Sequence, residues 1–116
     1  MLKRTPDWNA VIKNRSAAAH FNVFFAAKIQ VLTPNPFGTA IALTDVPGKP
    51  GFRGRDCVMQ DDLKGIELGL VLAHEAGHAL GEDGNAVAGH LMNDAAPGRT
   101  IPADTAGRMN DQAGKL

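Results

Sequence analysis

Hydrophobic positions near the start of the chain recur at helical spacing, and they predict a helix over about 6–18. Residues that favour the start of a helix accompany them: Thr5, Pro6 and Asp7. The next apolar run is β-branched and aromatic, which predicts a strand over about 21–31. Two shorter apolar runs predict strands over about 39–44 and 55–60, and the Pro- and Gly-rich residues 46–54 between them predict a loop.

A longer apolar run predicts a second helix, over about 63–80. Asp61-Asp62 offers an N-cap and negative charge at its start, and Gly81 suits the left-handed residue that ends a helix. Residues 82–100 are rich in Gly, Asn, Asp and Pro and predict a loop, and a last helix is expected from 101 to about 110. The helices and short strands together predict an α/β (α+β) fold.

Composition narrows the classes of partner. The 116 residues, 44% hydrophobic and 21% charged, suit one globular domain spanning 1–116. Twelve Lys and Arg balance 12 Asp and Glu, so we expect no nucleic-acid partner. No apolar run reaches 18 residues, so we expect no membrane span. We also expect the protein to be a monomer. The single cysteine, Cys57, allows neither an intrachain disulfide nor a Cys-based zinc site, and its apolar neighbours predict a buried thiol.

The second predicted helix carries a metal-binding pattern, His74-Glu75-Ala76-Gly77-His78, which is H-E-x-x-H. Two His residues four apart lie on one face of a helix with their Cβ atoms about 6 Å apart, so both can ligate one metal ion. Glu75 projects beside the same face, where it can hold a metal-activated water without being a ligand. Two imidazole ligands and an adjacent carboxylate indicate a zinc-dependent hydrolase, with Zn²⁺ as its cofactor.

The residues after His78 extend the pattern, with Gly81 three residues later and Met92 further on. The run from His74 to Met92 resembles the matrixin branch of the metzincin zinc metalloproteases. By eye, the resemblance covers roughly residues 20–112.

This resemblance implies a small zincin domain, in which a short twisted sheet accompanies an active-site helix and a C-terminal helix. It implies a zinc endopeptidase acting on a peptide or protein substrate, with Glu75 as general base. It also implies that Met92 forms an apolar floor under the metal. The chain departs from the family at Gly84, which stands where the third His ligand is found.

Because Gly84 has no side chain, a third ligand must come from another residue of the loop. We favour His90, since imidazole suits zinc and a flexible loop precedes it. Asp83, one residue from the family position, is the alternative, and Asp94 and Asp104 are more remote candidates.

Two other functional readings stay open. A decayed site would leave a catalytically inactive metzincin-like module that binds peptides, and the chain could also be the protease domain of a larger toxin or effector. Residues 1–4 are not followed by the apolar core of a secretion signal. Because metzincins are often exported, the sequence could still be a mature or trimmed form of an exported protein.

Overall fold

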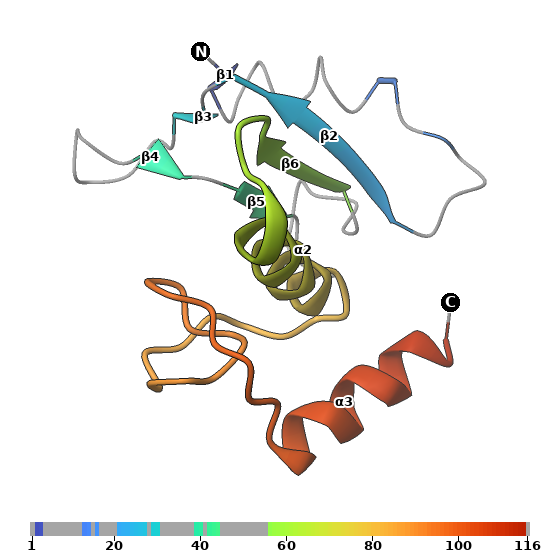
Figure 1. Cartoon of the computed structure of the whole chain (residues 1–116). Helices are drawn as coiled ribbons and strands as arrows, with labels where there is room; N and C mark the ends of the chain where they lie inside the picture. Colours follow the sequence, from blue (N-terminus) through green and yellow to red (C-terminus); the bar gives the residue numbers. More distant parts are fainter. Residues whose placement is uncertain are drawn as a thin grey trace.

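The computed structural model describes residues 2–3, 13–14, 16, 21–27, 29–30, 39–40, 42–44 and 56–115. Within these ranges the chain has mixed α/β content, as predicted. Figure 1 shows helix α2 (Gly65–Ala79) beneath a small sheet, with a long loop and helix α3 (Ala103–Ala113) on the other side of α2.

The sheet beside α2 has the strand order β2-β6-β5, so β6 (Asp56–Gln60) is its central strand. β6 pairs in parallel with β2 (Asn22–Ala26) and antiparallel with β5 (Ala42–Thr44). Residues 56–59 are all buried, as expected of a strand that is covered on both faces. A second small sheet, in the order β1-β3-β4, consists of two-residue strands: β1 (Leu2–Lys3), β3 (Ile29–Gln30) and β4 (Thr39–Ala40).

The hydrophobic core lies where α2 packs on the sheet. Its buried members are Cys57 and Met59 of β6 and Val71 of α2. Partly buried apolar residues surround them: Phe21, Val23, Ala42, Leu63 and Leu68. Burying one side chain of the size of Met59 contributes about 1.5–3 kcal/mol, so this contact holds α2 in place. The predicted burial of the Cys57 thiol is confirmed.

The start of α2 differs from the prediction. The helix begins at Gly65, two residues later than expected, and its N-cap is Lys64, whose side chain makes no capping hydrogen bond. The expected cap Asp61-Asp62 instead forms the turn after β6, because the Asp61 N–H donates to the Ala26 carbonyl (2.9 Å). Because Asp61 is hydrogen-bonded to the end of β2, Asp61 and Asp62 do not cap the helix.

The end of α2 agrees with the prediction. Gly81 has a φ of 91°, a left-handed conformation that suits glycine. The Glu82 N–H reaches back to the Gly77 carbonyl (3.0 Å), so the chain reverses beside the last turn of the helix. The predicted loop 82–100 follows, and α3 extends three residues beyond the expected end at 110.

The predicted strands appear in shorter pieces. The strand expected over 21–31 is divided between β2 and β3, and the strand expected over 39–44 is divided between β4 and β5. The predicted helix 6–18 and loop 46–54 lie outside the described residues, apart from 13–14 and 16. In the described part of the chain, no helix has the length and hydropathy needed to cross a bilayer.

Candidate metal centre

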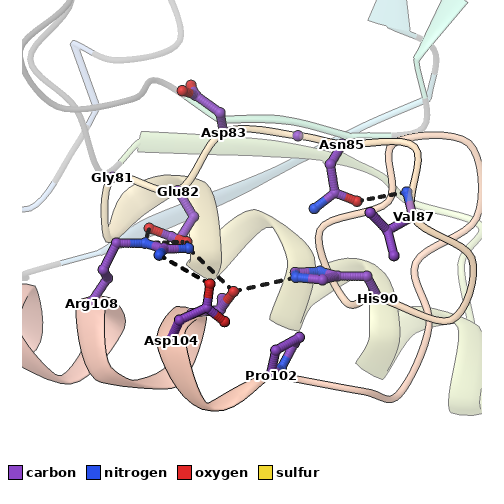
Figure 2. Close-up of a pocket in the computed structure, with 11 residues that line it drawn as sticks. Gly81, Glu82, Asp83, Asn85, Val87, His90, Pro102, Asp104 and Arg108 are labelled. Carbon is purple, nitrogen blue, oxygen red and sulfur yellow. Dashed lines mark hydrogen bonds and ion pairs between the residues drawn. The ribbon is translucent and has the colours of Figure 1, made fainter.

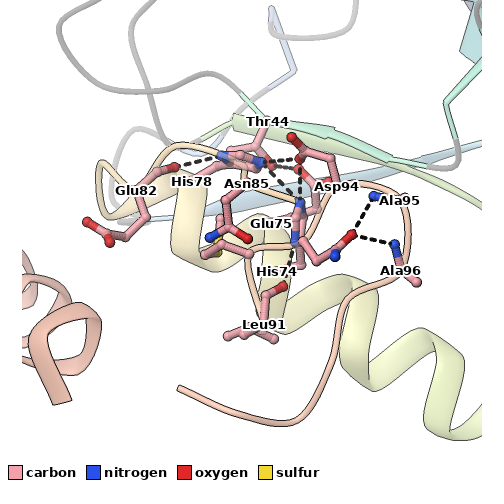
Figure 3. Close-up of polar contacts among 12 residues, drawn as sticks. Thr44, His74, Glu75, His78, Glu82, Asn85, Leu91, Asp94, Ala95 and Ala96 are labelled. Atoms are coloured by element: carbon pink, nitrogen blue, oxygen red, sulfur yellow. Dashed lines mark hydrogen bonds and ion pairs between the residues drawn. The ribbon is translucent and has the colours of Figure 1, made fainter. Parts of the chain in front are cut away.

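Helix α2 brings His74 and His78 together on one face, as their four-residue spacing predicts (Figure 3). Their Nε2 atoms lie 3.1 Å apart. The rings are nearly perpendicular, at 86°, with centroids 4.7 Å apart. Both imidazoles therefore direct the same nitrogen toward one point.

The other ring nitrogens show which tautomer each imidazole adopts. Nδ1 of His74 lies 2.7 Å from the Leu91 carbonyl, and Nδ1 of His78 lies 2.7 Å from the Glu82 carbonyl. A carbonyl can only accept, so each Nδ1 carries the proton and donates it. In the neutral form, each ring would then have its lone pair on Nε2, the nitrogen that faces the other histidine. This is the arrangement of metal-ligating imidazoles, which commonly donate their second N–H to a backbone carbonyl.

Asp94 supplies a third donor atom to the same point. Its Oδ1 lies 3.2 Å from Nε2 of His74 and 3.6 Å from Nε2 of His78. Four-coordinate zinc with bonds of about 2.0–2.2 Å separates neighbouring donor atoms by roughly 3.3–3.6 Å. The observed spacings of 3.1, 3.2 and 3.6 Å are close to this range, and the two shorter ones lie just below it. Among the described residues, His74, His78 and Asp94 form the group of side chains placed to hold a metal.

Gly84 explains how the Asp94 carboxylate reaches this position. A Cβ built on Gly84 would overlap the carboxylate of Asp94. The backbone holds the two segments together, because the Asp94 N–H donates to the Asn85 carbonyl (3.1 Å) and the Asn85 N–H to the Met92 carbonyl (2.8 Å). The carboxylate thus occupies the space that a side chain at position 84 would fill.

His90, the favoured third ligand, lies elsewhere. It is buried, its Nδ1 accepts the Met92 N–H (2.8 Å), and its Nε2 lies 3.3 Å from Oγ1 of Thr105. Both ring nitrogens are therefore engaged: Nδ1 stabilises the turn 90–92, and Nε2 connects that turn to α3. That turn carries the Leu91 carbonyl that accepts from His74, so His90 supports the site through the backbone.

The remaining candidates do not join the cluster. Asp83 is exposed and is not part of the metal-binding group. Asp104 lies on α3, where its Oδ2 pairs with the guanidinium of Arg108 (3.4 Å). Asp94 was only a remote candidate from the sequence. Most of the chain between it and His74 is irregular, after the end of α2 at Ala79, and no spacing rule covers such a contact.

Met92 lies under the helix turn that bears the two histidines. It is 1% exposed, and a Cβ on Gly77 would overlap its sulfur atom. The glycine at position 77 therefore lets the methionine pack directly against the α2 backbone between His74 and His78.

Glu75 is 5% exposed and faces the end of β5 (Figure 3). Its Oε2 accepts a hydrogen bond from the Thr44 hydroxyl. Burial raises the pKa of the Glu75 carboxyl above its ordinary value and the Asp94 carboxylate adds to the rise, while the Thr44 hydroxyl and the two imidazoles oppose it. Thr44 was not singled out from the sequence; its place at the polar end of a short strand was the available signal.

Two pockets flank the loop after α2. One, of about 700 Å³, contains the bidentate ion pair of Arg108 with Glu82 and the inward face of His90 (Figure 2). The other, of about 350 Å³, is mainly apolar and lies between α2 and the segment that follows Asp94. Its lining comes from these two elements: Ile66, Glu67, Leu70, Val71, Ala95, Ala96 and Pro97.

No known protein family matches the chain, and comparison with curated proteins and with solved structures likewise finds no match.

Proposed function

We propose that the protein is a zinc-dependent endopeptidase of metzincin type, with His74, His78 and Asp94 as metal ligands and Glu75 as general base. The observation that carries the proposal is that Nε2 of His74 and Nε2 of His78, 3.1 Å apart, converge with Oδ1 of Asp94 on one point. Imidazole nitrogen and carboxylate oxygen are the donor types that zinc takes, and these three donor atoms lie close enough together to share one ion.

The donor set suits zinc, which takes imidazole nitrogen and carboxylate oxygen and keeps one position open in catalytic sites. A bound Zn²⁺ supplies Lewis acidity, which lowers the pKa of water and polarises a carbonyl group. Two His and one carboxylate can also hold Fe²⁺. The carboxylate of Glu75, next to His74 in the chain and not one of the three ligands, favours hydrolysis because hydrolysis needs a base at that place.

Glu75 is suited to move a proton. Burial favours its neutral form, while the Thr44 hydroxyl and the imidazoles favour its charged form. These opposing effects suit a group that accepts a proton from water and passes it to a leaving amine.

A peptide has a place to bind beside this cluster. β5 is the terminal strand of the described β2-β6-β5 sheet and ends at Thr44, next to Glu75. β6 has a neighbour on each side and therefore offers no free edge to a peptide. We propose that a substrate lies along β5 as an added strand, with an apolar side chain in the pocket that Val71 and Ala96 help to line.

The test combines metal analysis with peptide cleavage. Purified protein should bind about one zinc, and Glu75→Gln should keep that zinc while the cleavage rate on a mixed peptide library falls about 10²–10⁴-fold. Failure to take up zinc at micromolar metal would refute the metal centre. Zinc binding without any cleavage by the wild type would favour the peptide-binding module instead.

A further inference from the structure

The last residue of β5, Thr44, touches the general-base candidate across the interface between sheet and helix. Its hydroxyl donates to Oε2 of Glu75, which lies 31 residues further along the chain. Glu75 is 5% exposed, so water has little access to replace that donor. This buried hydrogen bond therefore restrains the direction of the Glu75 carboxylate more strongly than a hydrogen bond on the surface would.

The position of the Thr44 hydroxyl is itself held by the sheet. Thr44 pairs with Cys57 in the register between β5 and β6, and Cys57 is completely buried. A threonine in a strand has few χ1 rotamers, so the backbone position restricts the direction of the hydroxyl.

The hydroxyl of Thr44 has a single proton, and the carboxylate of Glu75 is the acceptor within its reach. A carboxylate only accepts, so the direction of this hydrogen bond is fixed by the chemistry of the two groups.

We infer that Thr44 is a positioning residue, which holds the carboxylate of Glu75 beside the cluster of His74, His78 and Asp94 without touching substrate. This inference rests on the proposed function, because it gives Thr44 its importance through the role of Glu75 as base. Without the hydroxyl, the buried carboxylate of Glu75 would lose its hydrogen-bond donor, and nothing from β5 would hold it in its present direction. It would then be displaced from the place where a base is needed.

Two substitutions separate the hydroxyl from the shape of the side chain. Thr44→Val keeps the β-branched shape and removes the hydroxyl, and Thr44→Ser keeps the hydroxyl. In the zinc-loaded proteins we expect kcat on a cleaved peptide to fall about tenfold or more for Thr44→Val, with KM within about twofold, since part of the worth of a general base is lost. Thr44→Ser should stay within about threefold of wild type.

Two further measurements exclude a merely structural effect. In a Glu75→Gln background, Thr44→Val should cause no additional loss of kcat, because the group that it positions is already gone. Crystal structures of the zinc-loaded wild type and Thr44→Val should show the Glu75 carboxylate displaced in the variant only. Should Thr44→Val not fold, Thr44→Ala, which only removes atoms, takes its place.

A wild-type kcat in Thr44→Val, or an additional loss in the Glu75→Gln background, would overturn the inference. If the wild type cleaves no peptide, the proposed function fails, and the crystal structures still decide whether Thr44 fixes the carboxylate. An unmoved carboxylate in the variant would then refute the positioning role by itself.

Discussion

Gly84 and Asp94 share one space: the carboxylate of Asp94 lies where the side chain of residue 84 would be. The position at which the resembled family has a histidine ligand is thus open, and a carboxylate ten residues later fills it. A side chain at position 84 would therefore overlap the carboxylate that lies beside the two histidines.

The first prediction concerns the third ligand. Asp94→Ala should weaken zinc binding by at least about tenfold, the usual effect of losing a ligand or its close support. Asp83→Ala removes an exposed carboxylate of the same loop and serves as the control, with little expected change. Chelator competition measures both, and a larger effect at Asp83 would transfer the assignment to that residue.

Gly84 provides a second prediction. Gly84→Ala should weaken zinc binding about as much as Asp94→Ala, because the added Cβ displaces the carboxylate. Gly84→His should behave likewise while Asp94 is present. If Gly84→His strengthens zinc binding in the otherwise unchanged protein, the space is not occupied by Asp94 in solution.

Two glycines of α2 should respond in opposite directions to the same substitution. Gly77→Ala places a Cβ against the buried sulfur of Met92 and should lower the free energy of unfolding by about 1–3 kcal/mol. Gly69→Ala meets nothing within 4 Å and should raise it, by up to about 1 kcal/mol, through better helix propensity. Urea titrations of both variants check the pair, and a stabilising Gly77→Ala would contradict the packing of Met92.

The buried thiol of Cys57 predicts a dependence of stability on alkaline pH. Its pKa rises on folding from an ordinary value of 9.0 to about 12, chiefly through burial, so the folded state holds the proton more tightly than the unfolded state. The free energy of unfolding should therefore fall as pH rises from about 9 to about 12, by at most about 1.4 kcal/mol per pH unit from this group. Cys57→Ala should lack this component, which denaturant titrations of both proteins at each pH would reveal. If the free energies of unfolding of wild type and Cys57→Ala changed in parallel with pH, the thiol would have the same pKa in the folded and unfolded states.

The sequence by itself determined the parts of the site that lie on one helix. His74, Glu75 and His78 belong to an apolar run that forms α2, and the 3.6-residue period alone puts the two imidazoles on one face. The helix end at Gly81 follows from the conformational freedom of glycine. The central strand over 56–60 was also predictable from its short apolar pattern.

Only the tertiary structure decided which other residues join this helix. Asp94, Thr44 and His90 reach their partners through irregular loops and through contacts between sheet and helix, and no local period governs such contacts. His90 was favoured for its chemistry, but its two ring nitrogens contact the Met92 N–H and the Thr105 hydroxyl, and it is not part of the metal-binding group. Asp94 comes to the pair because Gly84 leaves room and Asn85 holds the backbone close. Residue type shows which side chains can bind a metal, while the path of the backbone selects those that can meet at one point.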